Sequence, residues 1–168
     1  MKTPVPLLFF LFALWVTCCS SADETIDPNV GMNDEEMQET TEGVAEVTDV
    51  SVSGEENQYT FSVTISSPDL GCQQYADWWE VIDLDGNLIY RRILTHSHVT
   101  EQPFTRTGGP VAISSTDEVY IRAHMNTTSY GNKVFKGSVS NGFTSGNLDV
   151  EFAIGLEKIA PLPAKCEF

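Results

Sequence analysis

The chain has 168 residues, and its 24 acidic and 9 basic side chains give a formal net charge of −15. That length accommodates one ordinary domain with a hydrophobic core. An apolar content of 41% excludes a wholly disordered chain. Such an acidic excess argues against nucleic-acid ligands and against anionic membrane surfaces, because both attract Lys and Arg.

Residues 1–22 have the pattern of a secretory signal peptide. Lys2 supplies a positive charge, residues 7–16 form a short apolar run, and a stretch of small residues ends at Ala22. This order of charge, apolar run and small residues predicts cleavage after Ala22. We therefore expect a secreted, periplasmic or cell-surface protein.

A lipid anchor on Cys18 or Cys19 is the weaker alternative to free secretion. Residues 14–17, which precede both cysteines, fit a lipid-attachment box poorly. A membrane-spanning helix needs about 20 apolar residues, and no run of that length follows the signal peptide. We expect no transmembrane segment in the mature chain.

Cleavage of the signal peptide leaves two cysteines, Cys72 and Cys166. Thiols of exported proteins usually oxidise, so we expect a disulfide between them, with two free thiols as the alternative. The bridge would tie the C-terminal extension, residues 141–168, back to the rest of the chain.

Residues 23–46 form an acidic leader that contains no Lys, no Arg and no aromatic residue. Such a segment cannot bury enough apolar surface to offset the entropy lost on ordering. We expect a disordered spacer, and loose cation binding is the functional alternative.

Residues 47–140 are predicted to form an all-β domain, an immunoglobulin- or fibronectin-III-like β-sandwich of about seven strands. Short strand-forming runs alternate with turn residues, and a closed barrel is the alternative. A further alternating run, residues 148–154, suggests another strand in the extension. The seven strands are expected at residues 47–53, 58–66, 75–82, 88–96, 110–114, 118–125 and 132–140.

The third and fourth predicted strands should form a hairpin. Asp85-Gly86 favours a two-residue type I′ turn, in which both central residues have positive φ. That turn fixes the register of the facing strands. The expected pairs are Trp78–Ile93, Trp79–Arg92, Glu80–Arg91 and Ile82–Ile89.

Three histidines suggest a transition-metal site for copper or zinc. His96 and His98 lie two residues apart at the end of a predicted strand. Residues at positions i and i+2 of an extended chain share a face, so both imidazoles should point the same way. Imidazole suits both metals. His124 or Glu101 could complete the ligand set. The alternative is that these are ordinary surface histidines.

Residues 102–109 are predicted to form a long loop that carries Gln102, Phe104 and Arg106. Loops on a rigid β-domain often bind partners, and Tyr130 could join the same surface. This interpretation makes the protein an adhesion or interaction module for an extracellular protein or a glycan. The loop could equally pack on its own domain.

Catalysis is not expected from the sequence. No serine lies in a Gly-x-Ser-x-Gly elbow, and the chain has no phosphate-binding or dinucleotide-binding glycine motif. No set of residues supplies a nucleophile, a base and a stabilising group together.

Residues 72–80, 91–104 and 122–125 together resemble a family of short exported, mainly bacterial β-domain proteins of unassigned function. The resemblance spans roughly residues 45–143. It implies an exported single β-domain and names no activity.

Overall fold

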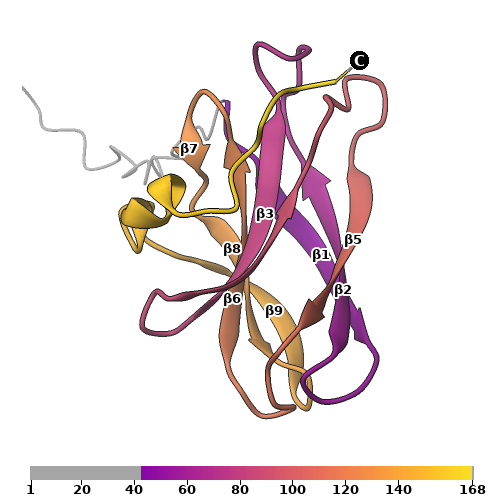
Figure 1. The fold of residues 1–168 in the computed structure, drawn as a ribbon, viewed down its shortest axis with the longest axis vertical. Helices are drawn as coiled ribbons and strands as arrows, with labels where there is room; N and C mark the ends of the chain where they lie inside the picture. Colours follow the sequence, from indigo (N-terminus) through magenta and orange to yellow (C-terminus); the bar gives the residue numbers. More distant parts are fainter. Residues whose placement is uncertain (1–42, 168) are drawn as a thin grey trace, which may run out of the picture. The chain divides into compact units, whose positions relative to one another are not determined.

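Two antiparallel β-sheets make up the part of the chain that this computed structural model describes, residues 43–167 (Figure 1). The predicted signal peptide and most of the acidic leader, residues 23–42, lie outside the described residues. No helix formed by residues 43–167 is long and apolar enough to cross a membrane.

The small sheet contains three strands in the order β1-β2-β5. They are β1 (Glu46–Ser53), β2 (Tyr59–Ser66) and β5 (Phe104–Val111). The alternation in β2 predicts one buried face, and the structure confirms it. The buried residues of β2 are Tyr59, Phe61, Val63 and Ile65.

The large sheet has the order β4-β3-β6-β8-β9, and the two-residue β7 pairs with β6. Together with the small sheet it confirms the all-β prediction. Its strands are β3 (Ala76–Asp83), β4 (Leu88–Ile93), β6 (Val119–Met125), β7 (Ser129–Tyr130), β8 (Lys133–Ser138) and β9 (Gly142–Asn147).

The fifth strand begins earlier than predicted. The sequence suggests a loop over residues 102–109 and a strand over 110–114, but β5 starts at Phe104. The loop prediction is therefore wrong for most of that segment. Glycine is depleted in strands, yet Gly108 lets the backbone of β5 pass close to the aromatic rings of Trp79 and Tyr90.

The predicted strand over residues 148–154 is also wrong. After β8 the chain turns over residues 139–141, and Gly142, whose φ is 79°, begins β9, which pairs with β8. The sheet thus extends beyond residue 140. Residues 148–153 form turns that lead into a short 3-10 helix, η1 (Ile154–Lys158).

The hairpin of β3 and β4 confirms three predicted pairs and contradicts the fourth. Trp78, Trp79 and Glu80 face Ile93, Arg92 and Arg91 as expected, but Ile82 pairs with Leu88 after an irregularity. The turn is also longer than two residues, since β3 ends at Asp83 and β4 begins at Leu88. The Asp83 carboxylate stabilises this longer turn by accepting hydrogen bonds from the backbone of Asp85 and Asn87.

Both faces of the central strands of the large sheet, β3 and β6, are buried. The inner face packs Trp79 and Val81 against the small sheet in one hydrophobic core. The outer face of the same strands carries charged groups, which we call the Glu80 cluster: Glu80, Arg91 and Arg122. The Glu80 carboxylate pairs with both arginines, and all three side chains are buried.

The outer face is covered by the end of the chain, residues 148–167, which we call the C-terminal strap. Figure 1 shows the strap, in yellow, running along β3. Arg91 donates hydrogen bonds to the carbonyls of Leu156, Ile159 and Pro161. Arg122 donates to the carbonyls of Phe152 and Ala153. The two arginines therefore bind the main chain of the strap.

A disulfide fixes the far end of the strap. Cys72 and Cys166 are bonded, with their Cα atoms 5.6 Å apart, which confirms the predicted pairing. Next to the bridge, the Glu167 amide donates a hydrogen bond of 2.6 Å to the Thr95 carbonyl.

Candidate functional site

His96 and His98 lie side by side, but they do not lie on a strand. β4 ends at Ile93, and both histidines are in the loop that follows. Their ring centroids are 4.6 Å apart. His96 is exposed, whereas His98 is 3% exposed and stacks on the Phe104 ring at 3.7 Å.

The buried His98 ring has no hydrogen-bond partner among the described residues, at either Nδ1 or Nε2. Its backbone amide donates to Asp69 Oδ2 at 2.7 Å, while Nδ1 lies 3.8 Å from the same oxygen. Burial, with the charges of Arg106 and His96, lowers the pKa of His98 to about 4. The imidazole is therefore neutral at physiological pH, with one nitrogen that can bind as a ligand.

A small pocket of about 60 Å³ lies beside these histidines, where the edge strands β4 and β5 face each other. Four nitrogen-bearing side chains line it, together with Ile93, Leu94 and Thr95. The four are Arg92, His96, His98 and Arg106.

The other two predicted metal ligands differ in position. The Glu101 amide donates to the His98 carbonyl at 3.2 Å, and the charge of Glu101 opposes the lowering of the His98 pKa. Glu101 binds Arg106 at 2.8 Å, and this hydrogen bond lowers the pKa of the Glu101 carboxyl. His124 lies on β6, opposite Trp78, which in turn pairs with Ile93 of β4. Within residues 43–167, no group of three or more His, Cys, Asp or Glu side chains is placed to hold a metal ion.

The four residues predicted to form a binding loop do not form one surface. Phe104 is 1% exposed beneath His98, and Tyr130 is 2% exposed beneath the Arg122 guanidinium, 3.5 Å from its ring centroid. Burial of both rings removes them from any docking surface. Gln102 bonds to Ser67 and the His98 carbonyl, and Arg106 remains partly exposed.

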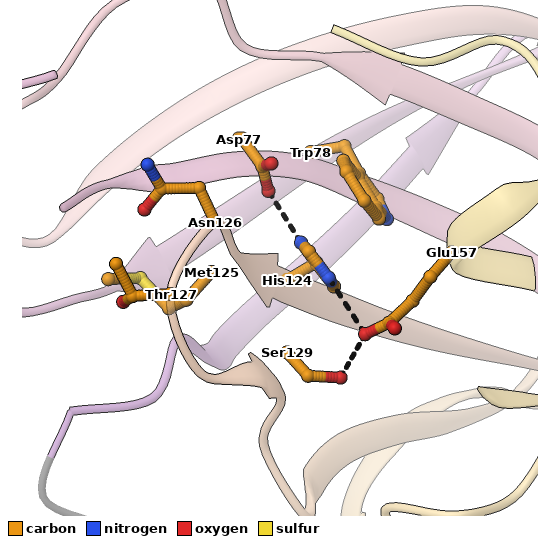
Figure 2. Close-up of a pocket in the computed structure, with 8 residues that line it drawn as sticks. All are labelled: Asp77, Trp78, His124, Met125, Asn126, Thr127, Ser129 and Glu157. Atoms are coloured by element: carbon orange, nitrogen blue, oxygen red, sulfur yellow. Dashed lines mark hydrogen bonds and ion pairs between the residues drawn. The ribbon is translucent and has the colours of Figure 1, made fainter. Parts of the chain in front are cut away.

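A larger pocket, of about 340 Å³, lies between the outer face of the large sheet and the C-terminal strap (Figure 2). Its volume is at the lower end of the range for small-molecule sites. The pocket is lined by Asp77, Trp78, His124, Met125, Asn126, Thr127, Ser129 and Glu157.

A chain of hydrogen bonds runs through this pocket, as Figure 2 shows. His124 Nδ1 lies 2.6 Å from Asp77 Oδ1, and His124 Nε2 lies 3.0 Å from Glu157 Oε1. Ser129 Oγ donates to the same Glu157 oxygen. The His124 ring also stacks on Trp78 at 3.6 Å, so its orientation is fixed by one face and by both nitrogens.

Two backbone irregularities bring these side chains together. The register of β3 against β6 shifts between Ala76 and Trp78, so Asp77 and Trp78 both reach His124. Ser129, the first residue of β7, has a φ of 68°. Ser129 pairs with Met125 of the core, yet its hydroxyl reaches Glu157 on the outer side.

Burial also shifts the acidity of groups around this pocket. Burial raises the pKa of the Asp77 carboxyl, and the hydrogen bond and charge of His124 oppose that change. Burial, followed by the charge of Glu80, raises the pKa of Tyr130. Both groups therefore lie in surroundings of low polarity, where electrostatic interactions are strong.

The sequence interpretation misses Asp77, Ser129 and Glu157 as pocket residues. No spacing in the sequence links them to His124. Asp77 reaches it because of a bulge, and Ser129 because of a left-handed backbone. Glu157 reaches it from the strap. In so acidic a chain, the presence of an isolated Asp or Glu does not indicate a functional site.

The fold and these pockets define a two-sheet, all-β domain with buried polar groups on its outer face. The chain is 39% identical over 84 residues to a protein of Halomicrobium mukohataei named "Putative lipoprotein". The match covers 50% of this chain and 41% of that relative, so the chain spans about two fifths of the relative's length. No protein-family model and no solved structure matches the chain.

Proposed function

We propose that the mature chain is an exported binding protein that holds a transition-metal ion, copper or zinc, between His96 and His98. The main support comes from His98, a buried imidazole whose two ring nitrogens have no partner among the described residues. A buried polar group without a partner is costly, and a metal ion would satisfy one of these nitrogens.

The neighbouring His96 supplies the second ligand in this proposal. It is exposed and 4.6 Å from His98 between ring centroids, so it can turn toward an ion bound at the first imidazole. The Phe104 ring, stacked on His98, fixes the orientation of the buried ligand. Water would fill the remaining coordination positions.

Export is part of the same proposal. It is supported by the signal pattern of residues 1–22, by the Cys72–Cys166 disulfide and by a relative whose name includes "lipoprotein". That relative also fits the resemblance to a family of exported proteins, although a bacterial source does not follow from it. A metal site on an exported domain would take its ion from outside the cytoplasm.

We further propose that the fold is of the immunoglobulin or fibronectin-III type. The first, second and fifth strands form one sheet, and in the other the third strand pairs with the sixth. This matches strands A, B, E and C, F of that fold, and the buried Trp79 lies on the third strand, as expected.

Titration of purified residues 23–168 with copper and zinc tests the metal proposal. We expect a Kd below about 1 μM for one of the two metals. Affinity should fall on acidification, because an imidazole must be deprotonated to bind. The exposed residue gives the cleanest variant, His96→Ala, which should weaken binding at least about tenfold without affecting folding.

The third histidine provides a matched control. His124→Phe should leave the metal affinity unchanged, since His124 is held by Asp77 and Glu157 on another part of the sheet. If wild type, His96→Ala and the double variant His96→Ala/His98→Ala bind the metals equally, the ion binds the acidic chain diffusely and the proposed site is wrong.

An interaction module without metal is the second candidate. One observation favours it: β5 is an edge strand of the small sheet, and its Thr105 and Thr107 are exposed. Backbone groups that an edge strand leaves unpaired can bind a strand of a partner protein. A Thr105→Pro variant, which removes a backbone donor from this edge, should then abolish partner capture and leave metal affinity intact.

A further inference from the structure

We propose that the pocket beside His124 is a binding site for a small carboxylate anion, and that the strap's own Glu157 occupies this site. The site is separate from the histidine pair of the loop after β4. It uses groups on the outer face of the large sheet and one side chain of the C-terminal strap.

The hydrogen bonds define what the site recognises. Glu157 Oε1 lies at hydrogen-bond distance from His124 Nε2 and accepts from Ser129 Oγ, so two groups converge on one carboxylate oxygen. His124 Nδ1 faces a second carboxylate, Asp77, at 2.6 Å. A carboxylate offers two acceptor oxygens, so it fits a position where a hydroxyl donor and a ring nitrogen meet.

The groups that contact the Glu157 carboxylate would lose a partner without it. His124 is buried, and its Nε2 and the Ser129 hydroxyl both meet Glu157 Oε1. A polar group of a buried side chain that lacks a partner is costly, which favours binding of another carboxylate in place of Glu157.

The Glu157 side chain is also easy to displace. It is 29% exposed and belongs to η1, which buries none of its residues. The residue before that helix, Ala153, has a left-handed backbone and provides no side-chain cap. Because Arg91 and Arg122 hold the neighbouring carbonyls, the Glu157 side chain can rotate away while the strap stays in place.

The pocket has space for a ligand larger than a single carboxylate. Its volume is about 340 Å³, and Thr127 and Asn126 line the side away from Trp78. A free anion must compete with a carboxylate that is tethered to the same molecule. The tethered group has a high effective concentration, so the wild-type protein should bind small carboxylates weakly.

Acetate titrations, followed by the ring ¹⁵N signals of His124, test this inference. In the Glu157→Ala variant, the His124 signals should shift and reach a plateau as acetate is added. The acetate Kd should be at least tenfold lower than that of wild type. Chloride at the same ionic strength should produce no such shift. Glu157→Gln, which keeps the size of the side chain, should also bind acetate more tightly than wild type, and it serves if the alanine variant unfolds.

Two further variants complete the design. Glu151→Ala removes an exposed carboxylate from the same strap and should behave as wild type. The double variant Glu157→Ala/His124→Phe should lose the saturable response, read from the Trp78 indole signal. Absence of a saturable shift in both Glu157 variants, or its persistence in the double variant, would overturn the proposal. Metal titrations report on the other site and do not affect this result.

Discussion

The Glu80 carboxylate accepts hydrogen bonds from Arg91, with 2.8 Å from Nε to Oε2, and neither side chain is exposed to solvent. The other oxygen of Glu80 accepts from Arg122, also at 2.8 Å. Both arginines then donate to carbonyls of the strap. One buried carboxylate thus orients the two side chains that bind the end of the chain.

Removal of that carboxylate should be strongly destabilising. We expect Glu80→Ala to lower the free energy of unfolding by about 3–5 kcal/mol, because two buried guanidinium groups lose their counter-charge. Urea denaturation measures this difference. The control is Glu118→Ala, which removes an exposed partner 3.9 Å from Lys136 and should cost less than about 1 kcal/mol. Equal losses in the two variants would contradict the assigned role of Glu80.

The disulfide should stabilise the domain as a whole. Its cysteines are separated by 94 positions, and chain-entropy estimates for such a loop give about 4–5 kcal/mol. The variant Cys72→Ser/Cys166→Ser should therefore melt at a lower temperature than the oxidised protein. Hydrogen exchange should show faster opening near Thr95 and Glu167, whose backbones are bonded beside the bridge. If the variant and the oxidised wild type melt together, the arginine contacts alone hold the strap.

His98 should make stability depend on pH. Its pKa is about 4 in the folded protein, against 6.5 for the ordinary side chain. As the pH falls, the unfolded chain therefore takes up this proton first, and the stability present above pH 6.5 is lost between about pH 6.5 and 4. The loss amounts to at most about 3 kcal/mol.

A phenylalanine at position 98 provides the comparison for that pH dependence. His98→Phe keeps an aromatic ring on Phe104 but cannot bind a proton. Its free energy of unfolding, measured by urea at several pH values, should change less than that of wild type between pH 6.5 and 4. Parallel curves for the two proteins would show that His98 does not titrate with the lowered pKa.

Gly108 should not tolerate a side chain. A Cβ atom there would lie 2.7 Å from Tyr90 Oη and 2.8 Å from Trp79 Cζ2. We expect Gly108→Ala to cost about 1–3 kcal/mol, because the Trp79 ring is fixed in the core. Gly146 of β9 is the matched control, since a Cβ there meets nothing within 4 Å. Gly146→Ala should be neutral or stabilise by up to about 1 kcal/mol, as measured by thermal unfolding.

The fold could be predicted where side chains alternate between core and solvent. The period of two in Tyr59–Ser66 gives both the strand and its buried face, and the charges of Glu80 and Arg91 agree with the observed hairpin register. The prediction failed at β5, where Gly108 and Gly109 suggest a loop. Glycine is needed there because two rings approach the backbone, Trp79 from β3 and Tyr90 from β4, and local sequence patterns do not contain such contacts.

The candidate sites show the same division. Residues two apart, His96 and His98, were expected to be neighbours, and they are neighbours even though the strand ends before them. The pocket around His124 could not be foreseen, because Glu157 reaches it from a segment 33 positions later in the sequence. Polar side chains that are brought together only by tertiary packing produce no periodic pattern in the sequence.

Because the arginines bind the main chain of the strap, their contacts place few demands on its amino-acid sequence. Arg91 and Arg122 contact its carbonyl groups, which every amino acid possesses, while Val150, Ile159 and Leu162 point largely into solvent at 41%, 50% and 45% exposure. Most side chains of this segment can therefore differ between relatives, or be substituted by design, without loss of the arginine contacts. An epitope or a peptide tag grafted onto these outward positions would be displayed on a rigid support, clamped at one end by a covalent bond.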